Sequence, residues 1–204
     1  KGAEIERKHL LESVQRTASA TLGHHRHDWM NDLQILYGYI QLRKIDKLAD
    51  CVERIKERMA VESKISRLGI PALVFYLQSF REVNGSVHLD VEIEDELQLD
   101  QLLTAEQAEE LTEAIVETVR IFQYKGRSSW GETLQLKMSM YREDGEVIVR
   151  FEQVGSKGNP EVLVRLLDEG MAGMRVKADR GEEEDGSLRL RVACGKINEV
   201  NACL

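Results

Sequence analysis

Residues 4–43 read EIERKHLLESVQRTASATLGHHRHDWMNDLQILYGYIQLR, and this stretch decides the N-terminal part of the fold. It contains no proline and only two glycines, and its apolar residues recur at spacings of three and four. That period predicts one long amphipathic helix. Its apolar seam is formed by Leu11, Ala18, Leu22, Trp29, Leu33, Leu36 and Ile40.

A second helix is expected after a short break at residues 44–46, and it ends near Arg67, because Gly69 and Pro71 are stop signals. Its seam consists of Leu48, Val52, Ile55, Met59 and Ile65. Two long helices with a short link predict an antiparallel hairpin. A hairpin alone leaves its outer seam uncovered. We therefore expect two hairpins to form a dimeric four-helix bundle; the alternative is that residues 72–83 fold back over the seam.

The apolar period changes from 3.6 to 2 near residue 86, which predicts a second kind of architecture. Residues 170–186, with the acidic run 182–185, are interpreted as a loop. The expected elements are strands at 87–93, 134–140, 147–151 and 188–192, helices at 105–123 and 161–168, and a hairpin turn at Glu143-Asp144-Gly145. The fold class is α+β, with antiparallel strand pairs and a helix layer that form a C-terminal α/β sandwich. We divide the chain into a helical domain, residues 1–83, and an α+β domain, residues 84–204.

Composition excludes several classes of protein. The net charge of −8 argues against a nucleic-acid binder, which needs a basic face. No apolar run approaches the roughly 18 residues of a membrane helix, and no signal peptide is visible. Three cysteines without metal-ligand spacing indicate free thiols in a reducing cytosol. We expect a cytoplasmic protein that binds neither nucleic acid nor membrane; because the chain begins at Lys1, its N-terminus need not be complete.

Three of the five histidines lie within residues 24–27, and helical geometry separates them. On a wheel that advances about 100° per residue, His25 falls on the apolar seam and His24 lies about 60° from His27. His27 is opposite the seam. Around it lies a stripe of small or polar residues, namely Ala20, Gly23, Asn31, Gln34 and Gly38.

The stripe around His27 calls for a physical reason, because glycine inside a helix costs about 1 kcal/mol relative to alanine. Small side chains at Gly23 and Gly38 would let another protein's surface approach the imidazole. Asp28 can hold one ring nitrogen as a donor and leave the other as nucleophile, and Arg26 can hold a phosphoryl oxygen. An exposed histidine without function is one alternative. A metal site is another, although no fourth ligand accompanies His24, His27 and Asp28 at typical spacing.

Two segments, HDWMN at residues 27–31 and LQILYGYIQL at residues 33–42, resemble the phosphoacceptor helix of the sporulation initiation phosphotransferase B family. This family belongs to the sporulation phosphorelay of endospore-forming Gram-positive bacteria and is related to sensor histidine kinases. The resemblance is specific over residues 24–42. The layout agrees over most of the chain, since a helical hairpin precedes a domain similar to a degenerate histidine-kinase ATPase fold.

The resemblance implies a histidine phosphotransferase. His27 would accept a phosphoryl group from the aspartyl phosphate of one response regulator and pass it to the aspartate of another, the sporulation transcription factor. The supporting residues would be Arg26, Asp28, Asn31 and Gln34, with Gly23 and Gly38 at the docking surface. The partners would be receiver domains and a second copy of the chain. We expect no cofactor or metal on this chain, because the Mg²⁺ would lie in the regulator's acidic pocket.

The main alternative is an autophosphorylating histidine kinase, which needs an ATP site in the C-terminal domain. Kinases of this class carry an Asn on the helix that here reads LTEAIVETVRIF, residues 111–122, where Glu113 and Glu117 stand instead. They also carry an Asp-x-Gly-x-Gly loop, whereas residues 151–159 read FEQVGSKGN. The glycines around MAGMR, residues 171–175, we interpret as a flexible loop. We therefore expect no nucleotide binding. A non-catalytic dimer that docks a response regulator is a third possibility.

Overall fold

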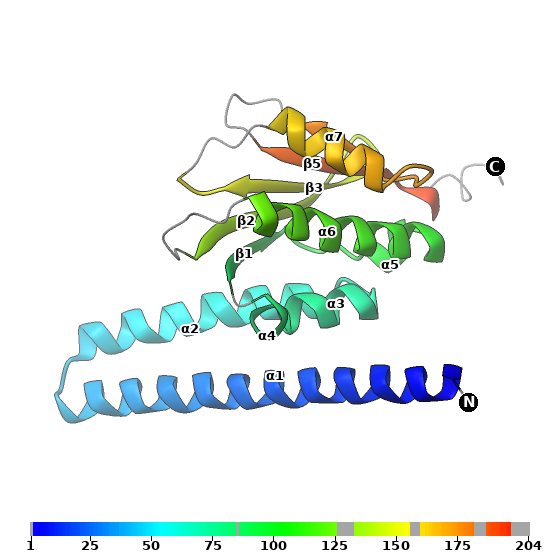
Figure 1. The fold of residues 1–204 in the computed structure, drawn as a ribbon. Helices are drawn as coiled ribbons and strands as arrows, with labels where there is room; N and C mark the ends of the chain where they lie inside the picture. Colours follow the sequence, from blue (N-terminus) through cyan, green and yellow to red (C-terminus); the bar gives the residue numbers. More distant parts are fainter. Residues whose placement is uncertain (1, 85, 126–132, 156–159, 182–186, 197–204) are drawn as a thin grey trace.

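The computed structural model begins with two long antiparallel helices, α1 (Gly2–Gln41) and α2 (Ile45–Ser66) (Figure 1). The structure describes residues 2–84, 86–125, 133–155, 160–181 and 187–196. The chain reverses over three residues, with Arg43 in the left-handed region at a φ of 53°. The helical N-terminal region predicted from the apolar period is thus confirmed.

The contact between α1 and α2 contains an ion pair that the apolar seams did not predict. Asp32 is the one buried residue that the structure describes on α1, and it forms an ion pair with Arg58 of α2. The seam residues lie elsewhere: Trp29 is 45%, Leu33 55% and Ile40 55% exposed. Our placement of Trp29 on an inward face is therefore wrong for the single chain.

Two short helices follow the hairpin, α3 (Pro71–Gln78) and α4 (Phe80–Val83). Helix α3 packs on α2, and α4 packs on α1 and on the first strand. Residues 72–83 do fold back, as the alternative proposed. They leave Trp29, Leu33 and Ile40 exposed, so the apolar seam stays uncovered in one chain.

The C-terminal part is a five-stranded sheet in the order β1-β2-β3-β5-β4. The strands are β1 (Val87–Ile93), β2 (Leu134–Glu143), β3 (Glu146–Gln153), β4 (Lys177–Arg180) and β5 (Leu188–Ala193). The β2–β3 hairpin turns at Asp144 and Gly145, which both have positive φ, as the predicted two-residue turn requires.

Two expectations about the sheet are wrong. Strand β1 pairs with β2 in parallel, because α5 (Leu99–Leu102) and α6 (Ala105–Lys125) form the crossover that a parallel pair needs. Strand β4 lies within residues 170–186, which we had interpreted as a loop. This edge strand spans four residues, of which only Ala178 is apolar, so it carries no alternating pattern.

Helices α6 and α7 (Pro160–Gly170) cover one face of the sheet and close the core (Figure 1). Helix α6 starts with a capping box, in which the Gln107 backbone N–H donates to Thr104 Oγ1 and the Thr104 N–H donates to Gln107 Oε1. The core includes Leu111, Ile115, Phe122, Met138, Phe151 and Leu190. On the hairpin side, Lys64 Nζ of α2 donates to the Ile93 carbonyl at 3.0 Å, which ties α2 to the end of β1.

Candidate functional site

His27 stands on α1 with its side chain 81% exposed. Its Nδ1 lies 3.9 Å from Oδ1 of Asp28, whose side chain is 38% exposed. That separation is longer than a hydrogen bond, and catalytic hydrogen bonds are often long before the partner binds. The imidazole is thus accessible to a partner and has a carboxylate beside one ring nitrogen.

The other oxygen of Asp28 is held by a residue that the sequence did not indicate. Nη1 of Arg81, on α4, donates to Asp28 Oδ2 at 2.7 Å. Fifty-three positions separate the two residues, so neither spacing nor motif could have joined them. The contact exists because α4 folds back onto α1.

The glycines of the stripe have open space around them. A Cβ built on Gly23 or Gly38 would meet no atom within 4 Å apart from the local helix backbone. Packing within the chain therefore does not require glycine at either position. The other residues expected to support His27, namely Arg26, Asn31 and Gln34, are exposed on the same helix.

His24 and His25 line a hollow of about 760 Å³ between α1, α2, α4 and β1, together with Arg54, Arg58 and Arg81. His25 is half-buried there, and His24 is exposed. Within the described ranges, no group of three or more His, Cys, Asp or Glu side chains is arranged to hold a metal ion.

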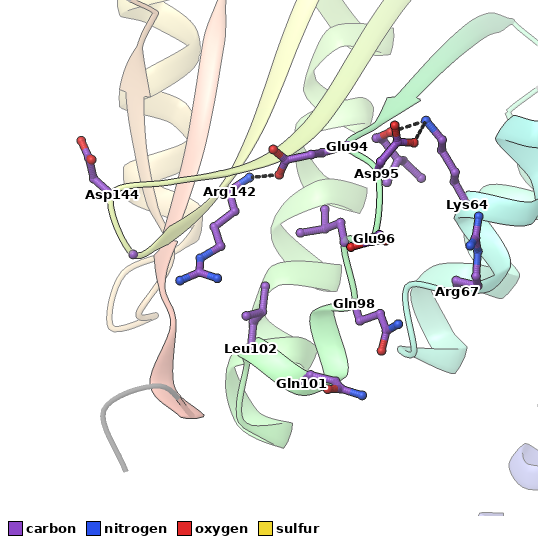
Figure 2. A pocket seen from close by; sticks show the side chains of 13 residues that line it. Lys64, Arg67, Glu94, Asp95, Glu96, Gln98, Gln101, Leu102, Arg142 and Asp144 are labelled. Atoms are coloured by element: carbon purple, nitrogen blue, oxygen red, sulfur yellow. Dashed lines mark hydrogen bonds and ion pairs between the residues drawn. The ribbon is translucent and has the colours of Figure 1, made fainter. Parts of the chain in front are cut away.

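A second hollow, of about 780 Å³, lies where α2, the segment after β1 and the β2–β3 turn meet (Figure 2). Its charges are mixed. Lys64 forms an ion pair with Asp95 at 2.7 Å, and Glu94 accepts a hydrogen bond from the backbone N–H of Arg142. None of the site residues predicted from the sequence lines this second hollow.

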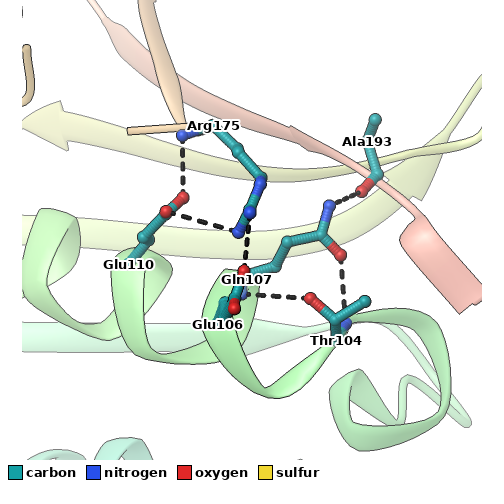
Figure 3. A network of polar contacts seen from close by, with 6 residues as sticks. All are labelled: Thr104, Glu106, Gln107, Glu110, Arg175 and Ala193. Carbon is teal, nitrogen blue, oxygen red and sulfur yellow. Dashed lines mark hydrogen bonds and ion pairs between the residues drawn. The ribbon is translucent and has the colours of Figure 1, made fainter. Parts of the chain in front are cut away.

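The helix that would hold the kinase asparagine is α6, and Glu106, Glu110 and Glu117 on it form ion pairs. Glu117 pairs with Arg120 at 2.7 Å. Near the start of α6, Glu106 and Glu110 both bind Arg175, at 2.6 Å and 3.5 Å (Figure 3). The Arg175 backbone N–H also donates to Glu110, at 2.7 Å. The MAGMR segment is therefore tied to α6 instead of forming the loose loop we expected. Residues 156–159 of the glycine-containing stretch lie outside the described residues.

Comparison with known proteins finds similarity in the hairpin. The family described as "Sensor kinase SpoOB-type, alpha-helical domain" matches residues 9–68, which include most of the His27 helix and all of α2. This part of the chain is therefore similar to the SpoOB-type helical domain. Sporulation initiation phosphotransferase B of Bacillus subtilis (strain 168) is 37% identical over 76 residues. That match covers 37% of this chain and 40% of the relative, so less than half of either protein is aligned.

Solved structures that are similar to most of the chain include two histidine kinases. The Acinetobacter baumannii histidine kinase AdeS has a TM-score of 0.39 at 11% identity, covering 83% of this chain and 98% of that one. The histidine kinase ThkA in complex with response regulator TrrA has a TM-score of 0.37 at 11% identity, covering 86% and 61%. At these scores the likeness carries no statement about activity. Over the described residues, no helix combines the length and the hydropathy needed to cross a membrane.

Proposed function

We propose that this chain is a histidine phosphotransferase of a sporulation phosphorelay. His27 would accept the phosphoryl group from the aspartyl phosphate of one response regulator and pass it to the aspartate of another. The observation that carries the proposal is the 81% exposed imidazole of His27 within the region that matches the SpoOB-type helical domain. The uncrowded glycines on the same stripe support it, because a receiver domain needs a close approach.

The proposed chemistry is two in-line transfers. The lone pair of His27 Nε2 attacks the phosphorus of the aspartyl phosphate, the N–P bond forms, and the P–O bond to the regulator's aspartate breaks and leaves a carboxylate. The positive charge of the ring is shared by the Nδ1–H, which faces Asp28. In the second step a carboxylate oxygen of the acceptor attacks the same phosphorus, and the N–P bond breaks to return a neutral imidazole. Positioning and charge neutralisation supply most of the catalysis.

The cations for this transfer come from both proteins in the proposal. Arg26 is exposed one residue before His27 and can reach a phosphoryl oxygen when a receiver is docked. Mg²⁺ would be held by the acidic pocket of the regulator, and this chain would bring no cofactor of its own.

We further propose that the protein acts as a homodimer. The exposed seam on α1, with Leu22, Trp29, Leu33 and Ile40, forms an apolar face on a helix that one chain leaves uncovered. Pairing two hairpins along this seam into a four-helix bundle would bury it and leave His27, on the opposite side of α1, accessible. The α/β domain would then serve as a scaffold without nucleotide chemistry.

One experiment separates this proposal from a histidine kinase. The protein is incubated with labelled ATP alone, and in parallel with a receiver domain carrying a labelled aspartyl phosphate. A phosphotransferase becomes labelled only by the receiver. Labelling by ATP alone would instead establish a kinase, and labelling by neither would leave only the docking dimer.

A further inference from the structure

We propose that Arg81 is a positioning residue for the phosphoacceptor. By binding Oδ2 of Asp28 it keeps Oδ1 turned toward Nδ1 of His27, so that Nε2 remains the nucleophile. The inference rests on the proposed function only in taking His27 as the phosphoacceptor.

The geometry gives the Asp28 carboxylate two separate tasks. Arg81 Nη1 lies 2.7 Å from Oδ2, and His27 Nδ1 lies 3.9 Å from Oδ1. A carboxylate with one oxygen fixed by a charged hydrogen bond cannot turn freely about its terminal bond. Its second oxygen therefore stays on the side of the imidazole, where it favours the tautomer with the proton on Nδ1.

Arg81 itself stands on an anchored part of the chain. Its neighbours Ser79 and Phe80 are buried, and Ser79 Oγ donates to the Phe75 carbonyl at 2.6 Å. The Phe80 ring meets Tyr76 edge to face, with the centroids 5.7 Å apart. Since α4 also packs on β1, the α/β domain fixes the place from which Arg81 reaches the phosphoacceptor helix.

A purely stabilising role fits the exposure of this pair poorly. The side chain of Arg81 is 70% exposed and that of Asp28 38%, and ion pairs at such positions contribute little to stability. The chain offers a matched comparison one turn along α1, where Arg58 of α2 binds the more deeply buried Asp32. A residue that only ties helices together should behave like Arg58.

The test compares Arg81→Ala with Arg58→Ala and with the conservative Arg81→Lys, using the full chain. Long-range ¹⁵N NMR of the His27 ring reports which nitrogen carries the proton, and phosphoramidate provides a small phosphoryl donor. We expect Arg81→Ala to shift the tautomer away from Nδ1–H and to slow phosphohistidine formation about tenfold. Arg81→Lys should keep most of the Nδ1–H tautomer and most of the rate of phosphohistidine formation. Arg58→Ala should change neither the tautomer nor the rate. In an Asp28→Asn background, Arg81→Ala should have no additional effect.

An unchanged tautomer and rate in Arg81→Ala, a faster rate, or an equal effect of Arg58→Ala would overturn the proposal. Should Arg81→Ala fail to fold, Arg81→Gln keeps a polar side chain with the same first three carbons but without the charge; failure of both would show a structural role and overturn the proposal as well. The NMR measurement needs no phosphoryl donor, so its outcome is independent of whether a receiver can label the protein.

Discussion

Replacing Gly23 by alanine separates the stability of α1 from its use as a docking surface. Gly23 lies in the middle of the helix, and an added Cβ meets no atom within 4 Å outside the local helix backbone. The folded chain therefore accepts the methyl group without strain. Because alanine has the higher helix propensity, we expect Gly23→Ala to raise the free energy of unfolding by about 1 kcal/mol. Gly38→Ala should gain less, since Gly38 lies in the last turn before Gln41.

The same methyl group should impair transfer from a receiver, because it stands on the stripe that a partner must approach. A displacement on the scale of an ångström can lower a reaction rate by about a hundredfold, and we expect a loss of about tenfold or more. The free energy of unfolding is measured by urea denaturation followed by circular dichroism. Transfer is measured from a labelled phospho-receiver and, separately, from phosphoramidate, which is too small to meet the added methyl group.

Ser13→Ala provides the control for helix propensity. Ser13 is exposed on α1 and lies fourteen residues before His27, about 21 Å along the helix axis. The Ser13→Ala variant should be more stable than the wild type and should accept the phosphoryl group from the receiver at the wild-type rate. If Gly23→Ala is stabilised and still accepts the phosphoryl group from the receiver at the wild-type rate, the stripe is not a docking surface and our reason for its glycines fails.

Further predictions concern the hairpin and the alkaline limit of stability. Asp32→Ala should lower the free energy of unfolding by about 1–2 kcal/mol, because it removes the buried partner of Arg58. The loss stays this small because the partly exposed Arg58 guanidinium can recover some hydration. Urea denaturation of Asp32→Ala and of Arg58→Ala tests this, and equal stability of Asp32→Ala and wild type would contradict it. Burial raises the pKa of Tyr76 to about 12 from 10.0, against a hydrogen bond from Asn84 that lowers it. The folded protein therefore holds this proton where the unfolded chain has lost it, so stability should fall between pH 10 and about 12 by up to about 2 kcal/mol. Tyr76→Phe should show less of that decline in pH-dependent denaturation, and an identical pH dependence would refute the assignment.

The sequence predicted the elements whose periodicity is complete within one segment. The apolar period of residues 11–40 and the alternation of residues 87–93 are each contained in one continuous segment, so the type of element can be read from that segment alone. Strand β4 was not predicted because it is short and lies at the edge of the sheet. The parallel pairing of β1 with β2 was not predicted because it depends on the path of the crossover helix between the two strands.

The candidate site shows the same division. The wheel correctly predicted that His27 is exposed, since it placed this residue opposite the apolar seam. The partners of its helix could not be predicted in this way: Arg81 reaches Asp28 and Arg58 reaches Asp32 from other helices. Only the expectation that residues 72–83 might fold back bore on Arg81. Its contact with Asp28 depends on the tertiary path of α3 and α4.

The most direct test of the central claim is to locate the phosphoryl group after transfer from a phosphorylated receiver domain. The labelled protein is digested under alkaline conditions, which preserve phosphohistidine, and the modified residue is found by mass spectrometry in the wild type and in His24→Ala, His25→Ala and His27→Gln. Our account predicts an acid-labile phosphate on His27, retained in the first two variants and lost in His27→Gln. Phosphate on His24 or His25, or label that persists in His27→Gln, would contradict it.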